Sequence, residues 1–263
     1  VHKSYDQPLE TFSTNIMGTI NLLEAIRTSS KKCVIINVTS DKCYENQELA
    51  RGYKETDMMG GLDPYSSSKG CAELITSSFR NSFFSNSDTK EFDISLASVR
   101  AGNVIGGGDW AENRIVPDII RGIIDKKIIK IRNPNAIRPW QHVLEPLRGY
   151  LELVEKIWNN KSEYAESWNF GPDHEDLKSV SWITDKIIDV WGSDVKVDNN
   201  NTNYKPETNL LKLDCSKAKS KIKWMPKIKL EQAIQLTVDW YKQYEQKNEL
   251  KEFTQNQIEE YGY

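Results

Sequence analysis

The amino-acid sequence predicts an α/β protein built on a parallel β-sheet that is layered with helices. Segments with the three- and four-residue apolar spacing of amphipathic helices alternate with short apolar runs of the kind found in buried strands. The 263 residues are 38% hydrophobic and 28% charged, which is typical of a folded protein and too apolar for a disordered one. A chain of this length is expected to fold without disulfides or metal.

The clearest elements lie in the first two-thirds of the chain. Helices are predicted at residues 9–27, 65–84, 113–125 and 144–158, and strands at 33–38, 92–99 and 168–170. The run at 33–38 is largely apolar, which favours a strand buried on both faces of a parallel sheet. Beyond Gly171, weaker signals predict helices at 182–191 and 230–246 and a strand at 194–197. The charged tail after Gln246 is expected to be loosely held.

Charge and cysteine usage exclude several classes of protein. The net charge of −3 argues against broad electrostatic binding to nucleic acid. No apolar segment approaches the ~20 residues that a membrane span requires, and no secretory signal is visible. The four cysteines are spaced for neither a zinc site nor a disulfide framework. We therefore expect free thiols, no bound metal and a reducing, cytoplasmic location.

Polar side chains follow the strand predicted at 33–38. They are Thr39, Ser40, Asp41 and Lys42, which place two hydroxyls, an acid and a base together. The carboxyl ends of parallel strands meet at one edge of a sheet, where ligands bind. The residues that follow the strands at 33–38, 92–99 and 168–170 should therefore line one common crevice.

Tyr65 and Lys69 open the helix predicted at 65–84 and, being four residues apart, lie one turn apart on the same face. A nearby ammonium favours the phenolate, which lowers the pKa of a tyrosine from its usual ~10. A phenolate can act as a general base on a substrate hydroxyl. The chain has eleven tyrosines, so one such pair is close to what chance supplies. The polar cluster at residues 39–42, upstream of the pair, is the observation that favours a catalytic role for Tyr65 and Lys69 over a chance occurrence.

Longer motifs accompany this pair. The Y-x-x-x-K helix, the strand end TSDK and the segment 15–25 (NIMGTINLLEA) resemble the extended short-chain dehydrogenase/reductases, a family of NAD-dependent epimerases and dehydratases. Blocks at 39–45 (TSDKCYE), 100–110 (RAGNVIGGGDW) and 131–146 (IRNPNAIRPWQHVLEP) are similar to the CDP-D-glucose 4,6-dehydratases of that family. The resemblance covers essentially the whole chain. It implies a partial Rossmann-like parallel sheet and a smaller C-terminal α/β domain that binds the nucleotide-sugar.

The resemblance implies a reaction and assigns residues to it. CDP-glucose would become CDP-4-keto-6-deoxyglucose, a deoxysugar precursor of lipopolysaccharide O-antigen, through NAD-mediated oxidation at C4, loss of water across C5 and C6, and reduction at C6. Tyr65 would be the base on the 4-hydroxyl, and Lys69 would also bind the nicotinamide ribose. Thr39 would be a further cofactor contact. Ser40 would bind the 4-oxygen, and Asp41 would protonate the departing C6 hydroxyl.

Lys42 departs from related dehydratases, which usually carry Glu at this position as the base that removes the C5 proton. A lysine at this position is instead what the CDP-D-glucose 4,6-dehydratases carry. It can act as a base only when neutral, which needs a pKa depressed by burial or by the neighbouring Lys69. As a cation it would stabilise the enolate. Both roles stay open.

A second polar group is assigned to substrate. By family position Asn103, Arg114 and Arg138 would bind the diphosphate and its flanking sugars, since arginine matches the geometry of phosphate oxygens. Asn169, at a later strand end, would add a contact. The three glycines at 106–108 would let the backbone approach a ligand closely or form a flexible loop. Structural positions are expected for Trp110, Trp140 and His142.

A dinucleotide-binding fold needs a glycine-rich turn after its first strand, and none is found here. By the resemblance, Val1 lies inside the cofactor domain, and on the order of a hundred residues would precede it. We expect residues 1–101, rejoined by about 144–170, to be the rest of the NAD-binding domain, and 102–143 with 171–263 to bind nucleotide-sugar. We also expect an exposed edge on the first strand and weak NAD binding by this chain alone.

Two other functions are weighed against the dehydratase. A nucleotide-sugar 4-epimerase of the same fold also uses Tyr and Lys, but it needs no acid–base pair at C6, so Asp41 and Lys42 argue against it. A catalytically silent fragment that only binds nucleotide-sugar is favoured by the expected truncation. The resemblance also implies a homodimer that pairs through the helices near 9–27 and 65–84.

Overall fold

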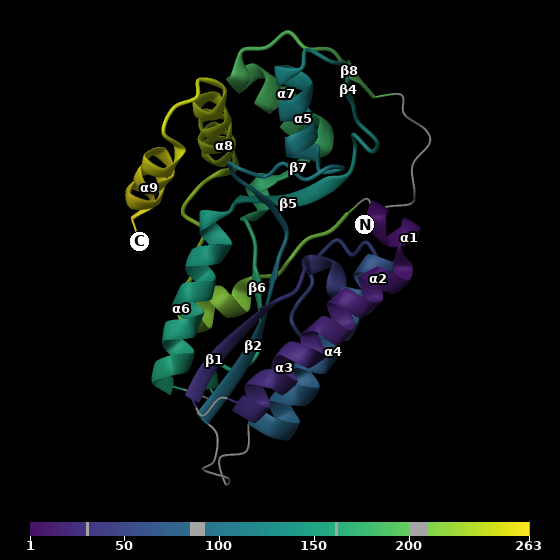
Figure 1. Ribbon diagram of the computed structural model, residues 1–263, viewed down its shortest axis with the longest axis vertical. Coiled ribbons are helices and arrows are strands. Elements are labelled where there is room, and N and C mark those ends of the chain that lie inside the picture. Colours follow the sequence, from purple (N-terminus) through teal and green to yellow (C-terminus); the bar gives the residue numbers. More distant parts are fainter. Residues whose placement is uncertain (30–31, 85–92, 161–162, 200–209, 263) are drawn as a thin grey trace. The chain divides into compact units, whose positions relative to one another are not determined.

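The computed structural model describes residues 1–29, 32–84, 93–160, 163–199 and 210–262. The chain divides into two compact units (Figure 1). Unit 1 comprises Val1–Gly102, Gly149–Phe170 and Lys212–Met225, and unit 2 comprises Asn103–Arg148, Gly171–Leu211 and Pro226–Tyr263. The segment 212–225, which the sequence assigned to the second domain, belongs to unit 1 because its Ile222 and Trp224 pack with Trp168 and Phe170.

Unit 1 is built on three parallel strands in the order β1-β2-β6. These strands are β1 (Lys32–Val38), β2 (Asp93–Ala101) and β6 (Ser167–Phe170). The helices are α1 (His2–Asp6), α2 (Pro8–Phe12), α3 (Gly18–Ser29), α4 (Pro64–Phe79) and, from Gly149 on, α6 (Leu144–Asn160). Shorter turns are η1 (Ser13–Met17), η2 (Asp41–Cys43), η3 (Arg80–Phe84) and η6 (Ala218–Ile222). The helices predicted at 9–27, 65–84 and 144–158 and all three predicted strands are confirmed.

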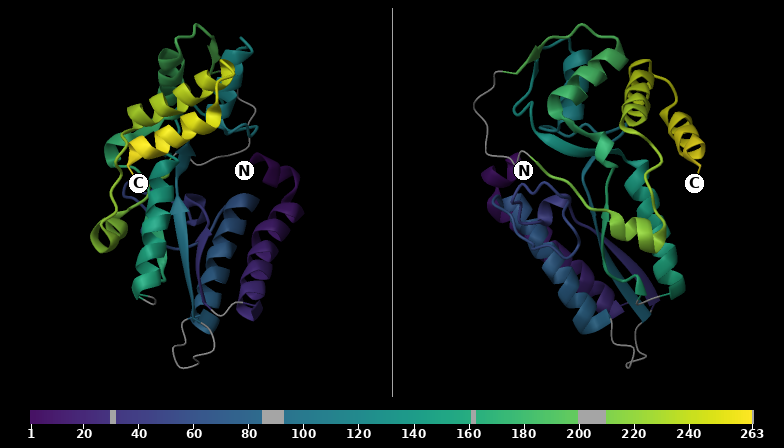
Figure 2. Two further views of the ribbon diagram at one scale, coloured as in Figure 1. Left: turned by 60° about the vertical axis from the view of Figure 1, so that its left-hand side comes forward. Right: turned by 180° about the vertical axis from the view of Figure 1, so that it is seen from behind.

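Alternate side chains of the sheet pack against helices on its two faces (Figures 1 and 2). On one face Ile35 and Leu96 pack with Leu23 of α3. On the other, Val99 packs with Leu153 of α6. This layering holds the carboxyl ends of the three strands at one edge of the sheet, as the sequence predicts.

Strand β1 forms an edge of the sheet, because within the described residues it pairs with β2 alone. Ile35 is the one buried residue of β1, and Val38 is 51% exposed. The expected burial on both faces is met in part, because Ile35 packs into one cluster while Val34 and Ile36 pack, half-buried, against the other. An edge strand has a sheet neighbour on one side only, which leaves its other side open.

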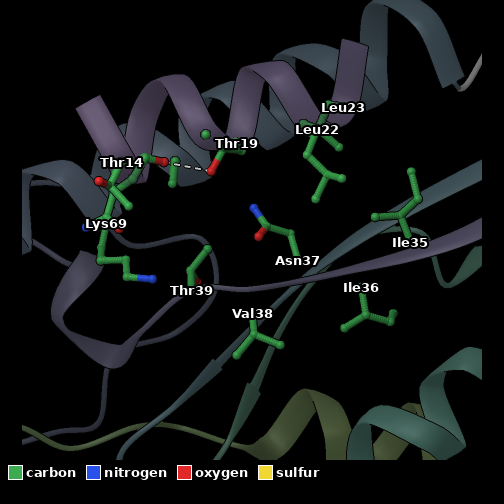
Figure 3. Close-up of a pocket in the computed structure, with 13 residues that line it drawn as sticks. Thr14, Thr19, Leu22, Leu23, Ile35, Ile36, Asn37, Val38, Thr39 and Lys69 are labelled. Carbon is green, nitrogen blue, oxygen red and sulfur yellow. Dashed lines mark hydrogen bonds between the residues drawn. The ribbon is translucent and has the colours of Figure 1, made fainter. Parts of the chain in front are cut away.

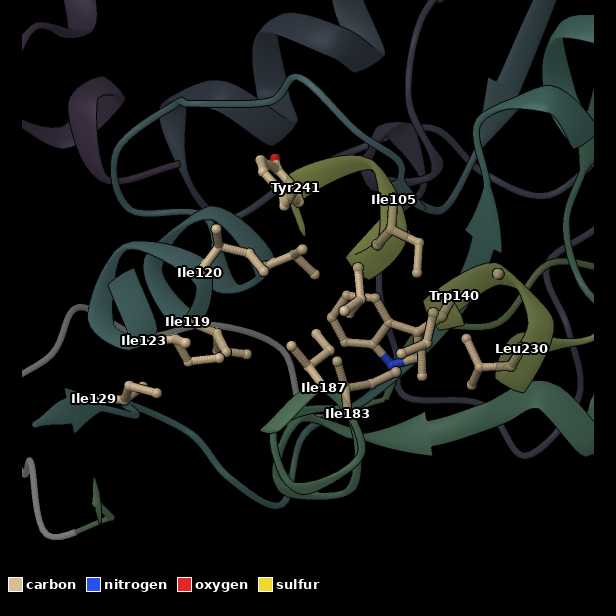
Figure 4. Close-up of a cluster of buried hydrophobic side chains, with 14 of the residues drawn as sticks. Ile105, Ile119, Ile120, Ile123, Ile129, Trp140, Ile183, Ile187, Leu230 and Tyr241 are labelled. Atoms are coloured by element: carbon tan, nitrogen blue, oxygen red, sulfur yellow. The ribbon is translucent and has the colours of Figure 1, made fainter. Parts of the chain in front are cut away.

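Unit 2 combines a mixed sheet with a group of helices. Its strands are β3 (Asn103–Ile105), β4 (Ile129–Lys130), β5 (Ile137–His142), β7 (Leu177–Ser179) and β8 (Val197–Asp198). β3 pairs parallel and β7 antiparallel with β5, and β4 pairs parallel with β8. Its helices include α5 (Ile115–Ile124), α7 (Val180–Trp191), α8 (Leu230–Glu245) and α9 (Leu250–Tyr261), with a short turn η5 (His174–Asp176). Side chains from α5, α7, α8 and β5 form one apolar core (Figure 4).

The chain after Gln246 is held in place, so the expectation of a loose tail is wrong. It forms α9, whose Gln257 Nε2 donates to the carbonyl of Leu236 (2.9 Å) in α8. The Tyr261 hydroxyl accepts from Arg148 Nε at 2.7 Å. These polar contacts hold α9 against the rest of unit 2, although few of its side chains are apolar and buried. Within the described residues, no helix has the length and apolarity needed to cross a membrane.

Candidate active site

The first part of the candidate site is the turn after β1. The N–H of Thr39 donates to the carbonyl of Val99 (2.9 Å), which extends the β1–β2 pairing by one residue. Ser40 then caps η2, since its Oγ accepts from the N–H of Lys42 (3.2 Å) and donates to Asp41 Oδ1 (3.1 Å). Asp41 is only 4% exposed, whereas Ser40 and Lys42 are half-buried. The turn therefore holds a hydroxyl and a carboxylate in contact beside a lysine.

The second part is the start of α4. Asp63 caps this helix by accepting the N–H groups of Tyr65 (3.0 Å) and Ser66 (3.1 Å), and Pro64 occupies the first helical position. Tyr65 and Lys69 are half-buried, and Lys69 Nζ lies 6.0 Å from the centroid of the Tyr65 ring. The predicted one-turn arrangement of phenol and amine is confirmed.

These two parts are packed together. The backbone of α4 approaches η2 so closely that a Cβ added at Gly70 would lie 3.3 Å from the carbonyl oxygen of Cys43. Burial lowers the pKa of Lys69 below its ordinary 10.5, while charge interactions with Cys43 and Glu73 act in the opposite direction. Lys69 therefore releases its proton more readily than a solvent-exposed lysine would.

A pocket of about 230 Å³ lies between the helical segment 8–29, β1 and α4 (Figure 3). Thr14, Thr39 and Lys69 line its polar end, and Leu22 and Ile35 line its apolar end (Figure 3). A lysine ammonium supplies three hydrogen-bond donors, and a threonine supplies a hydroxyl. The lining can therefore hold a ligand whose polar groups meet Lys69 and whose apolar part lies along β1.

Asn169 has a structural role in place of the predicted substrate contact. Its side chain is fully buried, and its Oδ1 accepts from the hydroxyl of Tyr44 (2.7 Å). Its Nδ2 donates to the carbonyls of Tyr53 (2.8 Å) and Asp214 (3.2 Å). These three hydrogen bonds occupy the donors and the acceptor of the amide with partners inside unit 1. The segments that carry Tyr44, Tyr53 and Asp214 therefore cover this end of β6.

Unit 2 carries the other residues predicted to bind substrate. Asn103 begins β3, beside β5. Arg138 lies within β5, is 5% exposed and donates to the carbonyl of Ile137 (3.0 Å). Arg114 precedes α5, and its side chain is 67% exposed with an ion pair to Asp109 (3.3 Å). Within unit 2, Arg114 is thus more accessible to an anionic ligand than Arg138.

The glycines at 106–108 approach other parts of unit 2 closely, which corrects the expectation of a ligand-binding or flexible loop. A Cβ added at Gly107 would lie 2.0 Å from Cγ of Trp240, and one at Gly106 would lie 2.8 Å from Cγ1 of Val143. Trp110, at the end of the loop, packs against two tyrosines of α8. Glycine is needed at position 107 because Trp240 of α8 leaves no room for a side chain, and at position 108 because the backbone has a positive φ of 82°.

Trp140 and His142 are buried, as expected of structural residues. Burial lowers the pKa of His142 to about 4, so the imidazole is neutral near pH 7 and its Nδ1 accepts the N–H of Leu144 (3.4 Å). All four cysteines are free. In the described part of the chain, no group of three or more His, Cys, Asp or Glu side chains is placed to hold a metal.

Four residues around the site escaped the sequence reasoning. Asn15 Nδ2 donates to Ser68 Oγ (2.8 Å), and Thr19 Oγ1 donates to the carbonyl of Asn15 (2.7 Å), so both help to build the pocket wall. Glu73 and Arg100 form a buried ion pair behind the site. Glu73 continues the four-residue spacing of Tyr65 and Lys69, which is the signal that would have found it.

Comparison with known proteins places these features in a family. The family model described as GDP-mannose 4,6 dehydratase matches residues 1–237. The chain is 46% identical over 261 residues to a CDP-glucose 4,6-dehydratase from Salmonella typhimurium, an alignment that covers 99% of this chain and 73% of that protein.

Solved structures agree in fold. A dTDP-glucose 4,6-dehydratase from Streptomyces venezuelae, solved with NAD, matches with a TM-score of 0.79 and 18% identity over 95% of this chain and 72% of that one. A UDP-N-acetylglucosamine 4-epimerase from Methanobrevibacter ruminantium matches with a TM-score of 0.77 and 22% identity over 93% of this chain and 74% of that one. At these identities the likeness establishes the Rossmann-like α/β fold.

Proposed function

Because the chain belongs to the GDP-mannose 4,6-dehydratase family, we propose that it is a nucleotide-sugar 4,6-dehydratase that converts CDP-D-glucose to CDP-4-dehydro-6-deoxy-D-glucose and water. The observation that carries the proposal is the packing of α4, with Tyr65 and Lys69, on the turn at residues 39–43. The choice of CDP-glucose rests on the 46% identity to the Salmonella enzyme.

The proposed cofactor is NAD, which dehydratases of the same fold contain in their solved structures. When bound, NAD supplies an acceptor for the hydride of the sugar C4 and returns that hydride to C6. The pocket beside β1 suits the nicotinamide end of this group, since Lys69 offers ammonium donors and Thr39 a hydroxyl oxygen at its polar end. We assign Thr39, Tyr65 and Lys69 to hold the nicotinamide ribose.

Tyr65 begins the reaction as the general base. As a phenolate it takes the proton of the 4-hydroxyl, while the Lys69 ammonium one turn away stabilises the phenolate. Ser40 hydrogen-bonds the 4-oxygen and polarises the carbonyl that forms there. The 4-ketone acidifies the hydrogen on C5 and so prepares the loss of water.

Asp41 and Lys42 serve the elimination across C5 and C6. Asp41, in contact with Ser40, gives a proton to the departing C6 hydroxyl. Lys42 either removes the C5 proton or stabilises the enolate as a cation. A Lys42→Arg variant separates these roles, because arginine keeps the charge and does not act as a base. Retained turnover indicates the cation, and loss of turnover with retained substrate binding indicates the base.

The diphosphate of the substrate is assigned to residues of unit 2. Arg114 and Arg138 would pair with phosphate oxygens, and Asn103 would hydrogen-bond a flanking sugar. The exposed side chain of Arg114 supports its part in this set.

The direct test is a turnover assay with NAD and CDP-glucose that follows the absorbance of the 4-keto sugar in alkali. The same assay with dTDP-, UDP- and GDP-linked sugars tests the nucleotide. Tyr65→Phe should abolish product, and the matched control Tyr244→Phe, on the exposed side of α8, should not. Absence of product from every nucleotide-sugar, with binding retained, would favour the silent-fragment alternative. Interconversion of C4 epimers without loss of water would favour the epimerase.

We further propose a homodimer that pairs through the helical segments 8–29 and 64–84. The exposed Leu9, Met17 and Leu74 on these helices support an apolar contact. The family resemblance also supports a cytoplasmic location and a part in making deoxysugar precursors of O-antigen. Sedimentation velocity tests the dimer, because Leu9→Lys and Leu74→Lys should convert it to a monomer.

A further inference from the structure

Glu73 is a buried carboxylate on the same face of α4 as Tyr65 and Lys69. It lies one turn beyond Lys69 and is 3% exposed. Thr39 Oγ1 donates to Glu73 Oε1 (2.5 Å), and Ser98 Oγ donates to Glu73 Oε2 (2.7 Å). One carboxylate therefore joins α4 to the turn after β1 and to the interior of β2.

Arg100 completes the connection on the side of β2. Its Nε donates to Glu73 Oε1 (2.9 Å), and its Nη2 donates to Glu73 Oε2 (2.7 Å), which is the bidentate arrangement that fixes orientation. Its Nη1 donates to the hydroxyl of Tyr44 (2.6 Å), the residue that follows η2. Tyr44 in turn donates to Asn169 of β6. The ends of all three strands are tied to α4 through this one ion pair.

On the premise of the proposed dehydratase function, we propose that Glu73 is a positioning residue, which holds the Tyr65–Lys69 face of α4 against the ends of β1 and β2. A helix can slide or rotate on a sheet when only apolar contacts hold it. Three of the four hydrogen bonds accepted by Glu73 come from β2 and the fourth comes from the turn after β1, so they fix α4 both along its axis and about it.

Glu73 also acts on Lys69 through charge. The groups of η2 that face this part of α4 are Asp41, Lys42 and Cys43. Burial lowers the pKa of Lys69, and the Glu73 carboxylate acts in the opposite direction. Burial raises the pKa of the Cys43 thiol, so this group stays neutral where Lys69 titrates. Loss of the Glu73 charge should therefore lower the pKa of Lys69 further, an effect that a purely structural residue would not have.

The test compares Glu73→Gln with Ser98→Ala. Both variants remove a hydrogen bond of the same cluster, but only Glu73→Gln removes the charge. Titration of lysine side chains labelled with ¹³C at Cε, with the Lys69 signal assigned by its loss in Lys69→Arg, reports the protonation of Lys69 without turnover. Steady-state rates with CDP-glucose report catalysis.

For Glu73→Gln we expect a lower titration midpoint for Lys69 and a turnover rate reduced on the order of 100-fold, the usual effect of misplaced reacting groups. Ser98→Ala removes one of the four hydrogen bonds and keeps the charge, so it should leave the Lys69 midpoint unchanged and lower the turnover rate far less than Glu73→Gln does. If Glu73→Gln does not fold, the double variant Glu73→Leu/Arg100→Met leaves no unpaired charge and should show the same two changes. An unchanged midpoint or an unchanged rate in a folded variant would overturn the proposal. If the wild-type protein does not turn over CDP-glucose, the proposed function fails, and the Lys69 midpoint alone decides the role of Glu73.

Discussion

Removal of either partner of the Glu73–Arg100 ion pair should destabilise the protein far more than removal of both. The two side chains are 3% and 2% exposed, so Glu73→Leu leaves a buried guanidinium and Arg100→Met leaves a buried carboxylate. An uncompensated buried charge costs about 3–5 kcal/mol, whereas replacement of a buried pair by apolar residues is often neutral. Each single variant should therefore lose about 3–5 kcal/mol of the free energy of unfolding.

The double variant should recover most of this loss, because the neighbouring hydroxyls have other partners. Thr39 Oγ1 can donate to the carbonyl of Val99 (3.2 Å), and Ser98 Oγ can donate to Ser167 Oγ (3.0 Å). We expect Glu73→Leu/Arg100→Met to lie within about 2 kcal/mol of wild type. Urea unfolding followed by circular dichroism measures all four proteins. A double variant with the full sum of the single losses, about 6–10 kcal/mol, would refute the reasoning.

The same pair predicts a dependence on pH. Burial raises the pKa of Glu73, but the hydrogen bonds and charge of Arg100 outweigh burial and hold this pKa below its ordinary 4.5. The unfolded chain therefore binds the proton more tightly than the native one, and the stabilisation is present above pH 4.5. It should be lost as the pH falls through the lowered pKa. The double variant Glu73→Leu/Arg100→Met should not show this loss of stability in acid. If the free energy of unfolding of wild type and double variant falls with pH in the same way, the assignment to Glu73 is contradicted.

Three more outcomes follow from single contacts. Gly107→Ala places a Cβ 2.0 Å from Cγ of Trp240 and should cost about 1–3 kcal/mol in urea unfolding, as overpacking does. NMR titration of His142 should show a midpoint near pH 4, because burial lowers its pKa, and a midpoint near 6.5 would mean that the ring is solvated. Tyr261→Phe removes the hydrogen bond from Arg148 and should speed proteolytic cleavage in α9 at least several-fold, while an unchanged rate would mean that other contacts hold the helix.

The sequence predicted the features of the site that depend on local spacing. Tyr65 and Lys69 share a face because they are four residues apart, and α4 packs on the turn η2 that follows β1. Hydrophobic periodicity also located the long helices, although it did not indicate the π-helical turns η1 and η3. Each turn is only five residues long, which is too short for a change of apolar period to be recognised.

Contacts between distant segments could not be predicted in the same way. Asn169 lies near the carboxyl end of β6, where a ligand could bind, but the carbonyls of Tyr53 and Asp214 reach its amide from more than forty positions away. Gly106 and Gly107 are used for packing because Val143 lies against the first and Trp240 against the second. The strands β3, β4 and β7 are two or three residues long, too short for an alternating pattern to appear. The six residues of β5 are buried on both faces except Ile137, so they show no alternation.

Transfer of label within the sugar tests the proposed reaction most directly. With NAD present, CDP-glucose carrying deuterium at C4 should give CDP-4-dehydro-6-deoxyglucose with that deuterium on C6, detected by ¹H NMR and mass spectrometry. Tyr65→Phe should give no labelled product, because the 4-hydroxyl then keeps its proton. A product without deuterium at C6, or full transfer by Tyr65→Phe, would contradict the account.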